Sequence, residues 1–394
     1  MDKSQYYQIP NRMKIAYIYD VIYPYVKGGA ERSFWELAKR LSKRNEVHLF
    51  GMKSWEGPAD FIKEGVHIHG IGKSRKLYSK SGIRNIREAL SFSLSILPAL
   101  FKERFDLIDC NAFPYLPYFP VKLYSLWSKT ALVITWQEVW DRYWYGYAGC
   151  LKGLIGRIIE RMVIITSGYI IAHSQKTKDA LYKCGFRGKG VKIIWHGVGL
   201  EQIQDIPPAE DKADLIFAGR LIKDKNVDML ITALALIKKE LPDISCFIIG
   251  EGPQKEKLIS QSQGLGLKGQ VHFKGFMEYE HIISQMKSAK IFVFPSTREG
   301  FGMVALEAMA AGLPVITVEH PMNSSTELIQ EGINGVICQP DAKELASNIL
   351  SLLKDRDTLN KLSRGARRST QTLDWDKIAV ITEDFYKEAI RERC

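Results

Sequence analysis

The sequence predicts an α/β protein of two doubly wound domains, each a parallel sheet covered by helices. A chain of 394 residues is too long for one compact core. Short apolar runs alternate with helical patterns from end to end, as is typical of parallel sheets covered by helices. A polar stretch at 201–212, which contains Pro207 and Pro208, separates two such series and predicts a linker.

Twelve of the apolar runs have the composition of buried strands, six in each half of the chain. The last segment has apolar residues at near-helical spacing and predicts a C-terminal helix. We therefore expect a first domain over 1–205, a second domain over 206–373 and this helix over 374–394. The expected strands are 14–19, 46–50, 105–109, 131–135, 169–172 and 191–195, then 214–218, 244–249, 270–274, 291–294, 314–318 and 335–338.

The composition excludes several classes of protein. Hydrophobic residues make up 46% of the chain and charged residues 25%, as in an ordinary soluble globular protein. The six cysteines are scattered singly, which argues against a disulfide framework and against a zinc site. Residues 1–12 lack the pattern of a signal peptide and no apolar run is long enough to span a bilayer, so we expect a cytoplasmic protein.

The formal net charge of +11 predicts an anionic partner. A nucleotide-sugar, an anionic lipid and a nucleic acid all fit this charge, but nucleic-acid binding rests on the charge alone and is not expected. A basic run leads into apolar residues at helical spacing, which fits docking of the first domain on an anionic membrane surface. An ordinary amphipathic helix behind a solvated loop fits the same pattern. The run consists of Lys73, Arg75, Lys76, Lys80, Arg84 and Arg87.

The stretch from Phe294 to Pro314 has the most specific pattern. A strand stops at Pro295, a glycine-containing loop follows, and a helix is expected over 305–311. Backbone amides at a helix start favour a phosphate, and two carboxylates flank this position, Glu299 and Glu307. Carboxylates suit hydroxyl groups, so we infer a diphosphate with a sugar on one side and a ribose on the other, which is a nucleotide-sugar. The residues expected at this site are Gly300, Phe301, Gly302, Met303 and Val304.

Two cations follow the first strand of the second domain. Arg220 comes directly after the strand, and Lys225 begins the next helix after a short loop. Two cations at the carboxyl end of a strand can clamp a diphosphate and neutralise the charge that grows on it as the sugar departs. A solvated loop with a surface lysine is the alternative, and Lys223 in the same loop has no assigned role.

A glycine pair, Gly28 and Gly29, follows the first strand of the first domain. The pair lets the chain turn back with no side chain in the way of a phosphate. A helix start with Glu31 favourable at its N-terminus is the alternative, and both readings can hold together.

Together these motifs resemble the donor-site signature of the retaining GT-B glycosyltransferases of the group 1 (family 4) type. The resemblance covers nearly the whole chain. It rests on Pro295-Ser-Thr-Arg-Glu-Gly-Phe-Gly with Glu307 and Gly312-Leu-Pro, on Gly28-Gly29-Ala30-Glu31, on Phe217-Ala-Gly-Arg220 with Lys225, and on Ile248-Ile-Gly-Glu-Gly-Pro253, Gly275-Phe276 and Asn334-Gly335.

The resemblance implies two Rossmann-like domains that face across a cleft, with the C-terminal helix packing back on the first domain. It implies that the second domain binds a nucleotide-diphosphate-sugar and the first an acceptor, either a glycan or lipid-linked. The implied reaction is a metal-independent transfer of a hexose-type sugar to an acceptor hydroxyl with retention, in glycan, polysaccharide or glycolipid biosynthesis. No cofactor is implied.

Residue roles also follow from the resemblance. Glu307 is expected to bind the ribose hydroxyls, and Glu299 to lie beside the donor sugar in a positioning and electrostatic role. Glu299, Arg220 and Lys225 are the expected catalytic residues. The further expected donor contacts are Gly28, Gly29, Gln137, Gly219, Gly250 and Phe276.

Gln137 departs from the family, which usually has a histidine at this point. A glutamine can hydrogen-bond a sugar hydroxyl but cannot carry a proton. If the position only orients the donor sugar, as we expect, the change alters the sugar preference. If the position needs acid–base chemistry, Gln137 keeps open a catalytically weak or inactive nucleotide-sugar-binding protein of the same fold. An epimerase or phosphorylase of the GT-B fold is a further alternative, but it should lack the set of Arg220, Lys225, Glu299 and Glu307.

No motif predicts a metal site. The D-x-D matches at 355–357 and 374–376 do not follow apolar strands and predict a helix surface and a helix cap. His67 and His69 share a strand face but have no third ligand nearby in the sequence. His173 and His196 are expected to be core or strand-end histidines, and lining of the cleft is the alternative.

Overall fold

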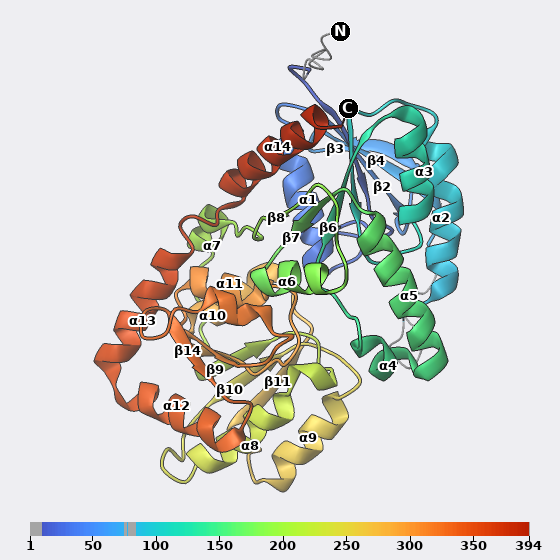
Figure 1. Ribbon diagram of the computed structural model, residues 1–394. Coiled ribbons are helices and arrows are strands. Elements are labelled where there is room, and N and C mark those ends of the chain that lie inside the picture. The colour runs from blue at the N-terminus through green and yellow to red at the C-terminus, as the bar shows by residue number, and fades with distance from the viewer. Residues whose placement is uncertain (1–9, 75–76, 78–83, 394) are drawn as a thin grey trace. The chain divides into compact units, whose positions relative to one another are not determined.

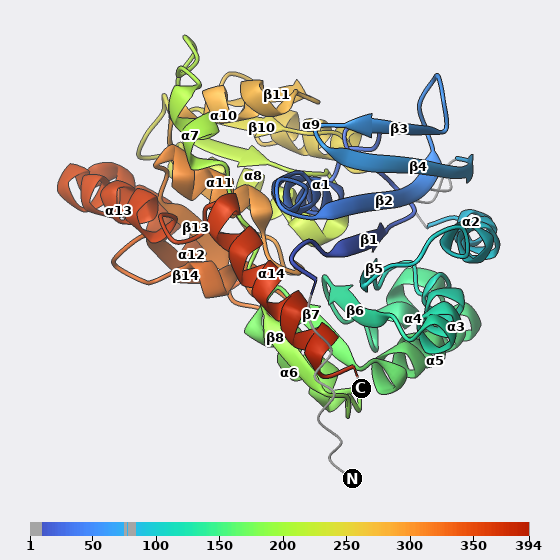
Figure 2. The ribbon, with the colours of Figure 1, turned by 90° about the horizontal axis from the view of Figure 1, so that it is seen from above.

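The computed structural model describes residues 10–74, 77 and 84–393, which form two compact units. Unit 1 combines residues 10–197 with the C-terminal segment from Trp375, and unit 2 is the continuous stretch Val198–Asp374. The chain therefore passes between the units twice, at Gly197–Val198 and at Asp374–Trp375. Each unit contains one sheet (Figures 1 and 2).

Unit 1 contains an eight-stranded sheet in the order β3-β4-β2-β1-β5-β6-β7-β8. All neighbours pair in parallel except β3 and β4. The strands are β1 (Lys14–Ile18), β2 (Glu46–Lys53), β3 (Asp60–Lys63), β4 (Val66–Lys73), β5 (Leu107–Asn111), β6 (Ala131–Trp136), β7 (Tyr169–Ala172) and β8 (Gly190–Ile193). The helices are α1 (Gly29–Leu41), α2 (Ile86–Leu100), α3 (Tyr118–Ser128), α4 (Tyr143–Ala148), α5 (Cys150–Thr166), α6 (Gln175–Lys183) and α14 (Trp375–Arg391).

Unit 2 contains a six-stranded parallel sheet in the order β11-β10-β9-β12-β13-β14. Its strands are β9 (Ala213–Ala218), β10 (Cys246–Ile249), β11 (Val271–Gly275), β12 (Ala289–Phe294), β13 (Val315–Val318) and β14 (Gly335–Cys338). Its α-helices are α7 (Leu200–Asp205), α8 (Val227–Ile237), α9 (Lys255–Gly264), α10 (Tyr279–Lys287), α11 (Met303–Ala311), α12 (Ala342–Lys354) and α13 (Arg356–Ser369). Two 3-10 helices are η1 (Lys223–Lys225) and η2 (Ser324–Leu328).

The predicted fold class is confirmed, with two differences. All twelve expected strands are present, but the sheet of unit 1 also contains β3 and β4, which are not among the twelve, although His67 and His69 were expected on a strand face. The stretch predicted as a linker begins with helix α7, which belongs to unit 2. Among the described residues no helix is both long and apolar enough to cross a bilayer.

Alternate residues of β1 face opposite sides of the sheet in unit 1. Ala16 and Ile18 belong to the core that α2, α3, α5 and α6 cover. Tyr17 points the other way, where its ring packs on Phe34 of α1 and its hydroxyl lies 2.9 Å from that of Tyr386 in α14. The C-terminal helix is thus part of the core of unit 1, on the side of the sheet that carries α1.

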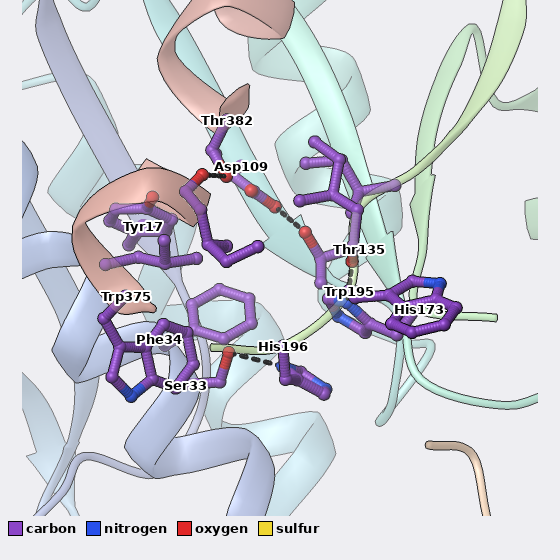
Figure 3. A pocket seen from close by; sticks show the side chains of 14 residues that line it. Tyr17, Ser33, Phe34, Asp109, Thr135, His173, Trp195, His196, Trp375 and Thr382 are labelled. Atoms are coloured by element: carbon purple, nitrogen blue, oxygen red, sulfur yellow. Dashed lines mark hydrogen bonds between the residues drawn. The ribbon is translucent and has the colours of Figure 1, made fainter. Parts of the chain in front are cut away.

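Asp109 of β5 lies within this second core and is 1% exposed. Its carboxylate accepts a hydrogen bond from the Tyr386 hydroxyl. It accepts a second one from the Thr135 hydroxyl at 2.7 Å, which Figure 3 shows. Burial raises the pKa of Asp109 to about 6, although both hydrogen bonds lower it. A cavity of about 10 Å³ lies beside this group, with room for about one water, so it is a packing defect and not a ligand site.

We expect Asp109 to make stability fall between about pH 4 and pH 6. Its pKa in the folded state, about 6, lies above the ordinary value, so the folded chain holds the proton more tightly than the unfolded chain. This contribution is fully present below the unfolded pKa and is lost as the pH rises through about 6. Two pKa units correspond to about 3 kcal/mol. The free energy of unfolding of Asp109→Asn, measured with urea and compared with that of the wild type, should therefore rise by about 3 kcal/mol between pH 4 and pH 6. A difference that does not change with pH would contradict the assignment.

Candidate functional site

The candidate donor site lies at the carboxyl edge of the sheet in unit 2. The first strand, β9, has β10 and β11 on one side and β12, β13 and β14 on the other, so the strand order reverses between β9 and β12. In open α/β sheets, ligands bind outside the carboxyl ends of the strands at such a point. The loops that follow β9 and β12 contact each other there: the Thr297 amide donates to the Asp224 carbonyl at 2.9 Å, and the Asn226 side chain donates to the Pro295 carbonyl at 3.0 Å.

The loop after β9 carries Arg220 and Lys225. Arg220 is exposed and directly follows the Gly219 turn. Lys225 ends η1, where its ammonium forms an ion pair with the Glu299 carboxylate and lies 5.2 Å from the centre of the Phe294 ring. The side chains of Lys225 and Glu299 are 17% and 12% exposed, so this pair is largely shielded from bulk water. The structure thus brings two of the expected catalytic residues together.

The backbone around Glu299 is fixed by its neighbours. Its amide donates to the Met322 carbonyl, and its carbonyl accepts from the Ser324 amide, each at 2.9 Å. Between these two residues Asn323 is fully buried, and its side-chain amide donates to the Val318 carbonyl at 2.7 Å. Arg298, the residue before Glu299, has its Nε 3.5 Å from the Asp224 carboxylate. These contacts hold the loop in place without using the Glu299 carboxylate.

Helix α11 starts two residues earlier than predicted, at Met303. Gly302 before it has φ of +94°, and a Cβ there would lie 2.7 Å from that of Ser325, so a glycine is required. The amides of Met303 and Val304 have no carbonyl to bind within the helix and are available to an anion. Phe301 is buried beneath this turn, while Gly300 is partly exposed. Glu307 is half-buried one turn beyond Met303, on the same side of α11.

The other expected donor contacts of unit 2 lie at the ends of neighbouring strands. Gly219 follows β9 and Gly250 follows β10, and they approach so closely that a Cβ on Gly250 would lie 1.9 Å from the Gly219 oxygen. The amide of Gly250 donates to the Gly275 carbonyl at 2.8 Å. Phe276, the next residue, is 61% exposed. These residues therefore share the edge with Arg220 and the α11 N-terminus.

In unit 1, Gly28 precedes α1 and Gly29 is its first residue. The Glu31 carboxylate lies against Gly28, where a Cβ would come within 2.2 Å of its Oε2, and it accepts a hydrogen bond from the Tyr19 hydroxyl at 3.3 Å. Burial raises the pKa of Glu31. The structure thus supports the helix-start reading of this glycine pair, and contact with a phosphate remains a prediction.

Gln137 follows β6 and belongs to a chain of polar side chains. His196 lies with its Nδ1 2.7 Å from the Ser33 hydroxyl and its Nε2 3.1 Å from the Gln137 Oε1 (Figure 3 shows the Ser33 contact). The Gln137 amide nitrogen in turn donates to Asn111 at 3.5 Å. Burial lowers the pKa of His196, and so does His173, which stacks on it at 3.7 Å. A neutral His196 ring that donates from Nε2 satisfies both of these contacts. The oxygen of Gln137 therefore already accepts a hydrogen bond.

Both histidines are buried, as the sequence analysis expected, at 3% for His173 and 2% for His196. His173 contacts the Ile194 carbonyl through Nδ1 at 2.7 Å, and burial lowers its pKa to about 4. Ser33 and Asn111 were not singled out from the sequence, because nothing in the local pattern indicates that they meet Gln137 and His196.

The structure supplies a neighbour for His67 and His69 that the sequence did not indicate. His48 of β2 stacks on His67 at 4.6 Å and lies with Nδ1 2.9 Å from His69 Nε2. Glu46, His48 and His67 have ligand-type atoms within 4.8 Å of one another. Glu46, however, already forms an ion pair with Lys14 at 2.7 Å, and its pKa is lowered to about 2, chiefly by the hydrogen bond from that ammonium. This group is distinct from the Gln137 chain.

Comparison with known proteins identifies two adjacent matches to family models. The model "Glycosyltransferase Family 4" matches residues 27–202, and the model "Glycosyl transferases group 1" matches residues 200–369. A glycogen synthase of Mycobacterium tuberculosis is 30% identical over 260 residues, which are 62% of this chain and 61% of that protein. The match thus spans about three-fifths of the length of this relative.

Solved structures share the fold at low sequence identity. Sucrose-phosphate synthase from Thermosynechococcus elongatus has a TM-score of 0.80 at 20% identity, covering 96% of this chain and 99% of that one. HepE from Anabaena, solved in complex with UDP-glucose, has a TM-score of 0.75 at 20% identity, covering 96% and 100%. At this identity the two structures establish the architecture alone.

Proposed function

Because the chain belongs to the retaining GT-B glycosyltransferases of the group 1 (family 4) type, we propose that it transfers a sugar from a nucleotide-diphosphate-sugar to an acceptor hydroxyl. The transfer retains the configuration of the sugar and needs no metal ion. The observation that carries the proposal is the Lys225–Glu299 pair, which lies at the reversal point of the sheet in unit 2, on the edge shared with Arg220 and the N-terminus of α11. This edge can hold a diphosphate and a sugar side by side.

The chemistry follows from where charge develops. When the sugar departs, its ring becomes oxocarbenium-like and negative charge grows on the diphosphate. Arg220, Lys225 and the amides at the start of α11 stabilise that charge. Glu299 holds the Lys225 ammonium in place and presents a carboxylate toward the sugar. The family resemblance implies that the departing phosphate takes the proton of the acceptor hydroxyl.

The identity of the donor can be tested with ligands of known base. HepE has been solved with UDP-glucose, so UDP-glucose is the first ligand to try, followed by GDP- and ADP-sugars. Thermal-shift measurements should show stabilisation by one base class in preference to the others, unchanged by EDTA or magnesium. Absence of a shift with every nucleotide-sugar would refute the proposal.

Gln137 supports a second candidate, a nucleotide-sugar-binding protein without turnover. Its amide is held between His196 and Asn111 and cannot take up a proton. Binding of a nucleotide-sugar without release of the nucleoside diphosphate, over a panel of acceptors, would favour this candidate. Release of the diphosphate upon addition of an acceptor would exclude it.

We expect the two carboxylates to have separable roles. Glu307→Ala should weaken the free nucleoside diphosphate and the full donor equally, by roughly 10–100-fold, because each ligand has the ribose. Glu299→Gln keeps an oxygen for Lys225 and should preserve the affinity for the free diphosphate while turnover falls. Isothermal titration with UDP and UDP-glucose measures both effects, and Glu256→Ala, exposed on α9, serves as the control. If both variants changed both ligands alike, these assignments would be wrong.

A further inference from the structure

The outer side of three helices in unit 1 has an unusual surface. Helices α2, α3 and α5 cover one side of the eight-stranded sheet (Figures 1 and 2), and their inner residues, such as Phe92, Val121 and Val163, belong to the core. Neighbouring helices are in contact. The Tyr118 hydroxyl of α3 donates to Thr166 of α5 at 2.9 Å, and Phe101 at the end of α2 packs on Trp127 of α3 at 4.7 Å.

The outward side chains of these helices are largely apolar. Leu94 of α2, Leu126 and Trp127 of α3, and Leu151 and Ile165 of α5 are between 53% and 77% exposed. Single exposed apolar residues are common, but a patch that extends over three adjacent helices indicates an interaction surface. We call the outer side of α2, α3 and α5 the apolar-basic face.

The exposed charged side chains that α2, α3 and α5 themselves carry are all basic. The acidic residues of the three helices are Glu88 and Glu160, and both are fully buried. Glu160 accepts hydrogen bonds from the Tyr115 hydroxyl at 2.6 Å and from the Trp140 amide at 2.8 Å, so it faces inward. The exposed charged residues of the helices are Arg87, Lys152 and Arg161, and Arg161 also forms an ion pair with Asp141 at 3.3 Å. A surface that combines aliphatic and tryptophan side chains with an excess of cations complements a layer of lipid phosphates.

We propose that the apolar-basic face docks unit 1 on an anionic lipid bilayer. The leucine and tryptophan side chains enter the interfacial region, while Arg87, Lys152 and Arg161 lie against the lipid phosphates. This inference rests on the proposed function in one respect, because docking would bring the transferase to an acceptor held in the membrane. It does not depend on Arg75, Lys76 and Lys80 of the predicted basic run, which lie outside the described residues.

A pocket links the apolar-basic face to the carboxyl edge of the sheet in unit 1. It has a volume of about 320 Å³ and is lined by Ile86 of α2, Ile155 of α5, and Phe113 and Leu116, which follow β5. Ile86 and Ile155 are themselves exposed on the face, at 62% and 50%. An acceptor with an apolar chain would therefore meet an apolar recess at the sheet edge where ligands of this fold bind.

The test is co-sedimentation of the full chain with phosphatidylcholine vesicles that contain or lack phosphatidylglycerol. Binding is expected only with phosphatidylglycerol and should weaken with salt. The triple variant Leu94→Glu, Leu126→Glu, Leu151→Glu should lose binding by more than about tenfold, as should Arg87→Glu, Lys152→Glu, Arg161→Glu. Ile62→Glu is the matched control, because Ile62 is 64% exposed but lies on β3. Brominated lipid should quench tryptophan fluorescence less in Trp127→Phe.

Three outcomes would overturn the proposal. The first is no binding to anionic vesicles at low salt. The second is binding that survives both triple variants and is lost on charge reversal at Arg75, Lys76 and Lys80. The third is a dimer in sedimentation equilibrium that Leu126→Glu dissociates, which would make a second copy of the chain the occupant. Titration with UDP reports on unit 2, so failure of docking with intact UDP binding would leave the proposed transferase function standing.

Discussion

Arg220→Ala and Lys225→Ala are each expected to weaken binding of the preferred nucleoside diphosphate by roughly 10–100-fold, because each removes one charge-assisted contact. Turnover should fall further than affinity, since the charge on the diphosphate grows as the sugar departs. Lys225→Ala has a second effect, because it leaves the Glu299 carboxylate, 12% exposed, without its ammonium partner. Isothermal titration and steady-state kinetics measure the two effects.

Lys223→Ala is the control for this pair. Lys223 lies in the same 3-10 helix as Lys225, carries the same charge and is exposed. Its removal lowers the net charge by the same amount but deletes no contact at the site, so affinity should stay within about twofold. Unchanged affinity in both Arg220→Ala and Lys225→Ala would remove the diphosphate clamp from the proposal.

The largest effect on stability is expected from Gly250→Ala. The φ of Gly250 is +138°, a conformation that alanine rarely adopts, and its Cβ would lie 1.9 Å from the Gly219 oxygen. The loop after β9 must therefore move, at a cost of about 1–3 kcal/mol, which lowers the Tm by roughly 2–12 °C. Donor affinity should fall as well, because Arg220 directly follows Gly219.

Gly264→Ala provides the comparison. Gly264 ends helix α9, and an added Cβ would meet nothing within 4 Å. Alanine is favoured over glycine in a helix, so the Tm should stay constant or rise slightly. Calorimetry on both variants separates the steric effect from a general effect of replacing glycine. A stable Gly250→Ala with normal donor affinity would show that the two loops can move apart freely.

Most of the fold could be predicted because buried parallel strands are short, apolar and separated by helical patterns. β3 and β4 were left out of the expected strands because β4, Val66–Lys73, alternates apolar residues with His67, His69 and glycines. An edge hairpin of this kind lacks a continuous apolar run. In the structure Glu64 and Gly65 both have positive φ and form a two-residue turn of the type that joins antiparallel strands, and of this turn only Gly65 is a signal in the sequence.

The candidate site also combines features that follow from a local sequence pattern with contacts that do not. Gly302 and helix α11 follow a local pattern, so the sequence predicted the glycine loop and the helix after it, with the helix start within two residues. The Lys225–Glu299 ion pair joins residues 74 positions apart, and its formation depends on β9 and β12 being neighbours in the sheet. The chain of Ser33, His196 and Gln137 spans 163 positions. Contacts of this kind follow from topology, which a pattern read along one chain does not give.

The contact between Tyr386 and Asp109 also determines when each unit can fold during synthesis on the ribosome. Unit 2 is continuous, so its sheet can form as soon as residue 374 has emerged. The residues of unit 1 begin to emerge first, but this unit cannot complete its fold before α14 has emerged. The Tyr386 hydroxyl of α14 donates to the Asp109 carboxylate, 277 positions earlier in the chain. Until then one side of its sheet, including Tyr17 and Asp109, lacks its cover. The unit that begins first is therefore the one that is completed last.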